Sequence, residues 1–316
     1  MLGVLPMTKT EKPQETPQQA PKPHVPNAER TLIYGVEGAG KTECWVDLAL
    51  NLPDTDFYVV DTDGSAAYTI HDVAAYHGLD PEPLLKRIRV YKVDDPYGSL
   101  EPPTGNPTNH ETQWQAIEKA VEAIRRSKPK PGSFMVMDRI DTAFEAVQQF
   151  WITNAYGDDP SAYWADLKAE QEEAEKGTAR DYGGFLGARD WVPIKKVYAR
   201  TINGFLSAPR VHKIAVALAK EPFAQSARAE EQKAMYGSLM PAGEKDQGAL
   251  FWTIVQVGKK QDGSHNLWVR RTKRRGGIGE VTNLGKPKPV QITTEDGKPD
   301  FYSSWYVPWF LGQGEG

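Results

Sequence analysis

A glycine-rich loop between a short apolar segment and a helical pattern constrains this chain more than any other feature. The segment "RTLIYG" (30–35) is an apolar run of strand length, and "KTECWVDLALNL" (41–52) has Val46, Ala49 and Leu50 available for one helical face. Between them, "GVEGAGKT" matches the pattern G-x-x-x-x-G-K-[S/T]. Glycines let backbone N–H groups turn towards one point, and the following helix directs its positive end to the same place. The stretch therefore predicts a phosphate-binding loop.

Every residue of this loop is a candidate for binding the phosphates of a nucleotide. The loop residues are Gly35, Val36, Glu37, Gly38, Ala39, Gly40, Lys41 and Thr42. Lys41 is expected to contact the β- and γ-phosphates, and the Thr42 hydroxyl is expected to bind Mg²⁺. The pattern thus predicts ATP and Mg²⁺ as cofactors.

Two further apolar segments end in acidic residues. "SFMVMD" is a continuous apolar strand whose last residue, Asp138, is the candidate to hold the Mg²⁺ shell. The strand at 56–64, "DFYVVDTDG", carries Asp61 and Asp63, and either carboxylate is a candidate to orient an attacking water. Asp-Gly also closes turns through side-chain to backbone hydrogen bonds, so the sequence leaves both interpretations open. Asp141 is expected to cap the helix that follows it.

The rest of the chain alternates between short apolar segments and helical patterns. Further strands are expected at 87–95 and 212–220, and helices at 109–127, 141–155, 160–176 and 191–206. Such alternation predicts an α/β fold with a mostly parallel sheet covered by helices on both faces. The last quarter differs, because "LFWTIVQVGKK" and "HNLWVRRTKRR" flank a turn and predict a C-terminal β-hairpin.

Composition limits the number of domains and the kinds of metal site, cross-link and membrane segment that the chain can contain. The chain has 316 residues, 39% of them apolar, which suits one large domain. Cys44 is the only cysteine, so an intramolecular disulfide and a multi-cysteine zinc site are excluded, and we expect it to be buried on a helix. The sequence has neither an apolar run of about 18 residues nor a signal-peptide core, which predicts a cytoplasmic protein without a membrane span. Residues 1–28 are rich in Pro, Gln and Lys and predict a disordered tail.

The C-terminal hairpin is the most basic part of the chain. Nine Lys or Arg stand against Asp262 and Glu280 between Gly258 and Lys288, although the whole chain has a net charge of −4. Such a patch suits a phosphate backbone or a neighbouring subunit's nucleotide, and an aromatic ring within it suits base stacking. A solvated surface hairpin is the alternative. The candidates for nucleic-acid contact are Lys259, Lys260, Trp268, Arg270, Arg271 and Arg274.

The order of these motifs resembles the RecA-like ATPases, and more narrowly the phage nucleotide-binding ATPases of the single-strand-annealing type. The resemblance covers about residues 30–276. It implies a RecA-like ATPase domain at 29–276 with an acidic helical insertion at about 156–185, followed by a C-terminal extension at 277–316. It also implies a homo-oligomer, as a ring or filament, with ATP sites between subunits. Single-stranded DNA and phage or host recombination or replication proteins are the implied partners.

Position by position, the resemblance implies further catalytic residues. The family's catalytic Glu falls on Asp63, which is one methylene shorter and predicts looser water positioning and slow turnover. The polar sensor falls on Lys220 or Glu221, at the end of a later strand. The family's K-x-R pair, which reaches the ATP of a neighbouring subunit, matches Lys273 and Arg275.

Two other functions remain compatible with the phosphate loop. A P-loop kinase of a nucleoside or small molecule would use the acidic helix at 160–176 as a lid, but it has no obvious use for the basic hairpin. A nucleotide-dependent structural switch with negligible hydrolysis would fit the shorter Asp63 side chain.

Overall fold

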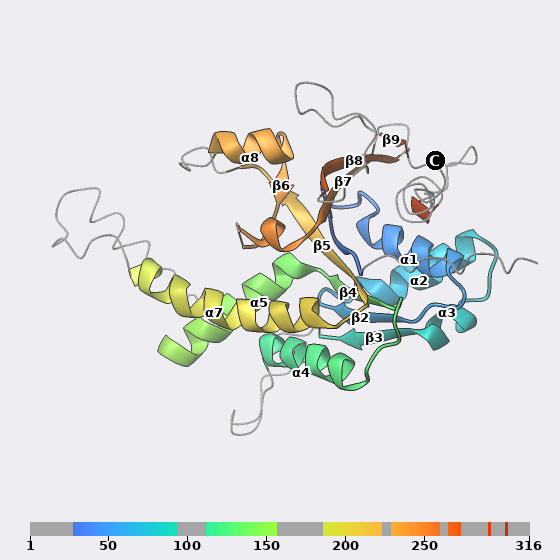
Figure 1. Cartoon of the computed structure of the whole chain (residues 1–316), viewed down its shortest axis with the longest axis horizontal. Coiled ribbons are helices and arrows are strands. Elements are labelled where there is room, and N and C mark those ends of the chain that lie inside the picture. Colours follow the sequence, from blue (N-terminus) through green and yellow to red (C-terminus); the bar gives the residue numbers. More distant parts are fainter. Residues whose placement is uncertain are drawn as a thin grey trace, which may run out of the picture.

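A computed structural model of the chain describes residues 28–93, 112–156, 186–222, 229–244, 246–259, 265–272, 290–291 and 301–302. Within these residues, nine strands form one sheet with helices on both of its faces (Figure 1). The strands follow the order β3-β2-β4-β5-β1-β7-β8-β9, and β6 pairs with β5 off this path. The predicted α/β fold, with a mostly parallel sheet covered by helices on both faces, is confirmed.

The strands are short. They are β1 (Arg30–Gly35), β2 (Phe57–Asp61), β3 (Ile88–Lys92), β4 (Phe134–Asp138), β5 (His212–Lys220), β6 (Met240–Pro241), β7 (Thr253–Lys259), β8 (His265–Thr272) and β9 (Val290–Gln291). The central strand β1 pairs in parallel with both β5 and β7, and β4 pairs in parallel with both β5 and β2. Parallel pairing brings the carboxyl ends of these strands to one edge of the sheet. The phosphate loop and Asp138 therefore share that edge.

Helices follow most of the parallel strands. They are α1 (Lys41–Asn51), α2 (Ser65–Tyr76), α3 (Glu82–Arg87), α4 (Gln113–Arg126), α5 (Ile140–Tyr156), α7 (Leu186–Ser207) and α8 (Ala229–Tyr236), with a 3₁₀ helix at Gln247–Leu250. One hydrophobic core packs α4, α5 and α7 against the sheet, and a second packs α1, α2 and α3 against its other face. Successive strand residues alternate between the two cores, since Leu32 belongs to the first and Ile33 to the second.

Local signals explain where α4 begins. The Thr112 side chain accepts a hydrogen bond from the Gln115 backbone N–H, and the Gln115 side chain accepts one from the Thr112 N–H. This capping box satisfies two backbone donors that the first helical turn leaves open.

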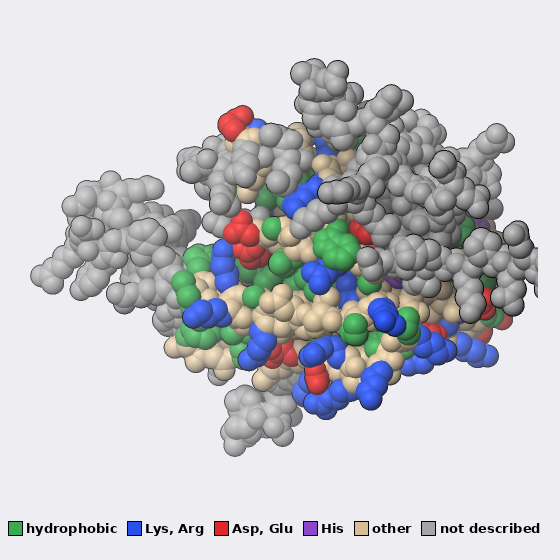
Figure 2. Space-filling view, viewed as in Figure 1, with side chains coloured by type: hydrophobic (Ala, Val, Ile, Leu, Met, Phe, Trp, Pro, Cys, Tyr) green, Lys and Arg blue, Asp and Glu red, His purple; other side chains and the backbone are tan. Residues whose placement is uncertain are grey.

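Figure 2 shows Lys and Arg side chains gathered over the lower part of the face on which α4 lies.

Most of the predicted elements are present within the described residues. The strands expected at 30–35 and 212–220 have those bounds, and the C-terminal hairpin forms from β7 and β8. Cys44 is buried on α1, as expected. The sequence patterns did not predict α2, α3 and α8, whereas the tail, the helix expected at 160–176 and most of the C-terminal extension lie outside the described residues. None of the described helices is both long and apolar enough to span a membrane.

The close approach of β1 to β7 requires a glycine at the end of β1. A Cβ added to Gly35 would lie 2.3 Å from the backbone oxygen of Val257, its partner on β7. We expect Gly35→Ala to lower the free energy of unfolding by about 1–3 kcal/mol, because backbone atoms must shift. Gly204→Ala is the matched control, since its added Cβ meets nothing nearer than 3.6 Å in the helix α7. It should be neutral or stabilise by about 0.5–1 kcal/mol.

Urea denaturation monitored by circular dichroism gives both values from the midpoint and the slope. Equal stability of the Gly35→Ala variant and the parent would show that β1 and β7 do not pack this tightly.

Candidate nucleotide-binding site

The predicted phosphate loop joins β1 to α1 at the carboxyl edge of the sheet. Gly38 and Gly40 have φ angles of 68° and 80°, in the left-handed region that favours glycine. Gly40 also stands at the N-cap of α1, where no side chain caps the helix. The first N–H groups of α1 are thus not satisfied by a capping side chain, and the helix dipole favours an anion there. Gly35 and Ala39 are buried, whereas Val36, Glu37 and Gly38 are exposed.

Lys41 lies inside this loop rather than in solvent. Its side chain is 7% exposed, and its Nζ donates to the backbone oxygen of Val36 at 2.8 Å. Burial lowers the pKa of Lys41, and the nearby Arg139 guanidinium lowers it further, while Asp138 and Asp141 act in the opposite direction. A phosphate in the loop would give the Lys41 ammonium an anionic partner.

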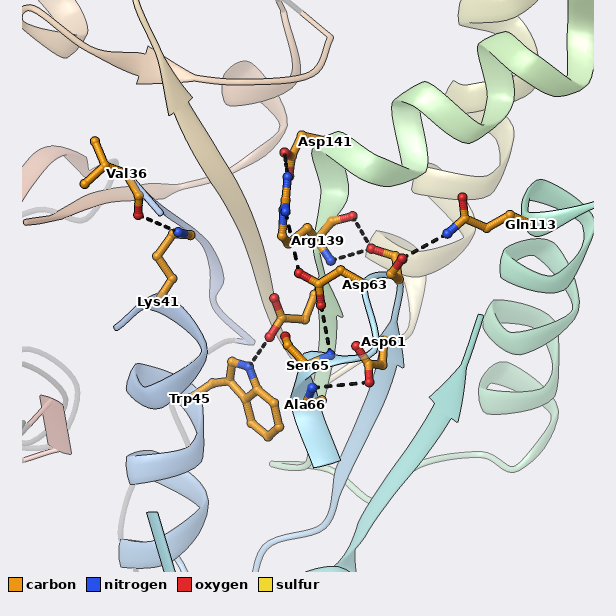
Figure 3. A network of polar contacts seen from close by, with 12 residues as sticks. Val36, Lys41, Trp45, Asp61, Asp63, Ser65, Ala66, Gln113, Arg139 and Asp141 are labelled. Atoms are coloured by element: carbon orange, nitrogen blue, oxygen red, sulfur yellow. Dashed lines mark hydrogen bonds and ion pairs between the residues drawn. The ribbon is translucent and has the colours of Figure 1, made fainter. Parts of the chain in front are cut away.

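Asp138 is fully buried at the end of β4. Trp45 Nε1 on α1 donates to its Oδ2 at 2.8 Å (Figure 3). The pKa of Asp138 is raised to about 7, chiefly by burial and also by Asp63 and Asp61, although Trp45 and the Thr42 side chain act in the opposite direction. Asp138 Oδ1 has no hydrogen-bond partner among the described residues. The structure therefore brings Thr42 and Asp138 together and leaves one buried carboxylate oxygen for a further ligand.

Asp61 and Asp63 both make turn-closing hydrogen bonds after β2. Asp61 is fully buried and its Oδ2 accepts from the Ala66 N–H at 3.2 Å. Asp63 Oδ1 accepts from the Ser65 N–H at 3.1 Å, and its side chain remains 25% exposed. The turn-closing interaction is thus present at both positions. Of the two carboxylates, that of Asp63 is the more accessible to water.

Sequence reasoning missed Arg139, which follows Asp138 and lies within the same network. Its Nη2 is 2.7 Å from Asp141 Oδ2, and its Nη1 is 3.6 Å from Asp63 Oδ2 (Figure 3). The prediction that Asp141 caps α5 is wrong. The helix begins at Ile140, so Asp141 lies in the first turn, where its buried carboxylate binds Arg139. No sequence motif predicts this role for Arg139, because Asp63 lies after β2 and Asp141 lies on α5.

Lys220 lies at the carboxyl end of β5, as the resemblance implied for the sensor. Its Nζ donates to the Gly243 backbone oxygen at 3.2 Å. Burial lowers the pKa of Lys220, while Asp141, Glu244 and Glu145 raise it. Asp141 therefore acts electrostatically on Lys41, Arg139 and Lys220. Of these three cations, Arg139 is the one in direct contact with the buried Asp141 carboxylate among the described residues.

The basic hairpin is described only in part. The Trp268 ring lies over Gly258, where an added Cβ would be 2.7 Å from the ring. Arg270 donates from Nε and Nη2 to Gln256 Oε1, at 2.8 Å and 2.5 Å, so its guanidinium is held against β7. Lys259 is exposed and Arg271 is half-buried. The remaining hairpin candidates, Lys260, Lys273, Arg274 and Arg275, lie outside the described residues.

A second missed residue, His265, begins β8 and reaches the phosphate loop. Its Nε2 lies 3.2 Å from the position of a Cβ added to Gly40, and Glu43 Oε2 lies 3.4 Å from the same point. The side chain is 6% exposed, and neither ring nitrogen has a hydrogen-bond partner among the described residues. Burial lowers the pKa of His265. The hairpin thus places a polar side chain beside the phosphate loop of the same chain.

The raised pKa of Asp138 makes the stability of the protein depend on pH. Between the ordinary pKa of 3.8 and about 7, the folded protein keeps this proton and the unfolded chain releases it. The stability contributed by this group therefore falls as the pH rises through that window. Without divalent cations, Asp138→Asn should gain about 2 kcal/mol relative to the parent between about pH 5.5 and about pH 8.5.

Denaturation curves at several pH values measure this difference. Asp80→Asn is the control, since Asp80 Oδ1 accepts the Glu82 N–H in an exposed turn. A difference between Asp138→Asn and the parent that stays constant with pH would contradict the burial argument.

Comparisons with known proteins add little to this description. No family model matches the chain, and no curated protein matches it. Among solved structures, the chain is similar to the crystal structure of the RadB recombinase, with 17% sequence identity and a TM-score of 0.43. The match covers 86% of this chain and 90% of that one. A likeness this distant says nothing about the ligands or activity of this chain.

Proposed function

We propose that this protein is a RecA-like ATPase that binds ATP with Mg²⁺ and hydrolyses it slowly. One observation carries the proposal: Lys41, Thr42 and Asp138 meet at the carboxyl edge of the sheet, beside the uncapped start of α1. Backbone N–H groups and Lys41 would bind the phosphates there. The buried site would strengthen each of these charged contacts, because water screens them less.

The residues present fit a magnesium ion. Asp138 Oδ1 is a buried oxygen without a partner among the described residues, and Thr42 lies beside Asp138. The described residues contain no group of three or more His, Cys, Asp or Glu able to hold a metal. Mg²⁺ commonly takes one or two protein ligands and completes its shell with phosphate oxygens and water. When bound, it would neutralise charge on the phosphates.

We assign Asp63 as the carboxylate that orients the attacking water. It is partly exposed, whereas Asp61 is fully buried and holds the start of α2. Asp63 is also engaged by the Ser65 N–H and faces Arg139, which supports slow turnover. The same observation favours the second candidate function, a nucleotide-dependent structural switch with negligible hydrolysis.

The further proposal is an oligomer that acts on single-stranded DNA in phage-type recombination or replication. Lys273 and Arg275 would contact the nucleotide of a neighbouring subunit, and the basic hairpin would contact the phosphate backbone. Lys259 supports this role because it is exposed at the end of β7.

Nucleotide binding and turnover test the ATPase directly. Lys41→Ala should abolish tight ATP binding in calorimetry while the circular dichroism spectrum stays unchanged. Asp138→Asn should weaken Mg²⁺-dependent turnover more than nucleotide binding. Asp63→Asn should lower kcat by about 10²–10⁴-fold without weakening nucleotide binding. Light scattering on the same samples reports assembly.

Each outcome separates the candidates. If Lys41→Ala binds ATP like the parent, the phosphate-loop assignment is wrong. If Asp61→Asn lowers kcat and Asp63→Asn does not, the water-orienting role moves to Asp61. If the parent binds ATP without turnover, with or without single-stranded DNA, the switch replaces the ATPase.

DNA binding by the hairpin is tested through its salt dependence. We expect Lys259→Gln and Arg271→Gln each to weaken binding of labelled single-stranded DNA, and each to flatten the slope against log salt by about one unit, because each removes one cation from the phosphate backbone. Arg126→Gln, at the end of α4, is the control for a general reduction of positive charge. Arg270→Gln should change hairpin stability instead, since its guanidinium binds Gln256. Unchanged slopes for both Lys259→Gln and Arg271→Gln would show that the hairpin does not bind DNA.

A further inference from the structure

Two carboxylates hold Arg139 at the candidate site, and one of them makes the closer contact. Asp141 binds its guanidinium at two points, with Nη2 2.7 Å from Oδ2 and Nε 3.4 Å from Oδ1. Asp63 contacts it more weakly, with 3.6 Å between Nη1 and Oδ2. The contact with Asp141 is therefore the anchor, and the contact with Asp63 is the one most easily exchanged for another anion.

The backbone of Arg139 is fixed, so any movement there would be confined to the side chain. The Arg139 N–H donates to Thr62 Oγ1 at 2.6 Å, and the Thr62 hydroxyl donates to the Arg139 oxygen at 2.8 Å. Thr62 is itself held, because its backbone oxygen accepts from Gln113 Nε2 at 2.9 Å. These bonds join the ends of β2 and β4 and place the guanidinium above them (Figure 3).

Arg139 and Lys41 lie at the same edge of the sheet, because Arg139 directly follows Asp138, and Asp138 binds Trp45 on the helix that Lys41 begins. After burial, the Arg139 guanidinium is the next largest cause of the lowered pKa of Lys41, whereas Asp138 and Asp141 raise that pKa. Two cations thus lie at the edge of the sheet where the phosphate loop and Asp138 come together. The Arg139 side chain is 23% exposed, so an incoming anion has access to it.

We propose that the Arg139 guanidinium contacts the terminal phosphate of a bound nucleoside triphosphate and, in doing so, leaves the Asp63 carboxylate. This inference rests on the proposed nucleotide site and adds a device that distinguishes the triphosphate from the diphosphate. Asp141 keeps the guanidinium in place during the exchange. Released from Arg139, Asp63 gains the freedom to accept a hydrogen bond from water. Without the terminal phosphate, Arg139 stays with Asp63, and the water-orienting carboxylate stays occupied.

The test is the ratio of affinities for a non-hydrolysable ATP analogue and for ADP, measured by calorimetry with Mg²⁺. Arg139→Gln should weaken analogue binding by about 10-fold to 100-fold and change ADP binding by less than about 2-fold, since the charge-assisted bond that it removes forms only with the triphosphate. Arg139→Lys, which keeps the charge, should recover part of the ratio. Arg126→Gln on α4 is the control and should match the parent.

A second variant, at Asp63, tests the same contact between Arg139 and Asp63. Asp63→Asn removes the competing charge, so it should raise affinity for the analogue and leave affinity for ADP unchanged. This gain should disappear when Arg139→Gln is combined with it, because the two residues act through one contact.

The outcomes distinguish this inference from the proposed function. Equal reductions in affinity for the analogue and for ADP in Arg139→Gln would make Arg139 a structural residue and overturn the inference, with the nucleotide site intact. Unchanged binding of both nucleotides in Arg139→Gln would also overturn it. Wild-type affinity in Lys41→Ala, or no binding by the parent, would overturn the proposed site itself and the inference with it.

Discussion

The parallel register of β2, β4 and β5 is the constraint on which the candidate site depends. It places Asp61 opposite Asp138, at the carboxyl ends of β2 and β4, and Asp138 opposite Val216 in the middle of β5. Two carboxylates on neighbouring strands repel each other, and burial penalises their charge further. The raised pKa of Asp138 follows from this arrangement. A sheet edge that gathers acids in this way requires cations, whether from the protein or from a ligand.

The protein supplies part of that compensation itself. Arg139 follows β4, Lys41 begins α1 and Lys220 ends β5, and all three interact electrostatically with Asp141. Asp141 is 2% exposed, and a buried charge of this kind persists only when it is paired. Asp138 forms no ion pair among the described residues, and the hydrogen bond that Trp45 donates to it is neutral. The internal cations thus neutralise one side of the site and leave the other dependent on a ligand.

The sequence predicted the fold better than it predicted the site. Apolar runs bounded by polar residues located β1 and β5 to the residue, because a strand buried on both faces leaves a continuous signal. The helix α2 carried a signal that was missed, since Ala66, Ile70 and Ala74 recur at helical spacing and are buried. Arg139 and His265 carried none. Their roles depend on Asp63 and Gly40, which only the folded sheet brings near them.

The charges that remain define what kind of ligand the site suits. The Lys41 ammonium donates to the backbone oxygen of Val36 and needs an anion, whereas Asp138 Oδ1 needs a cation or a proton. Phosphate alone would leave Asp138 uncompensated, and a divalent cation alone would add charge beside Lys41 and Arg139. A phosphate chain that carries its own metal ion satisfies both requirements at once. Magnesium-bound nucleotide is such a ligand, and the uncapped start of α1 offers it backbone N–H groups in the same place. On this argument, nucleotide and metal bind together because each one relieves a charge that the other leaves exposed.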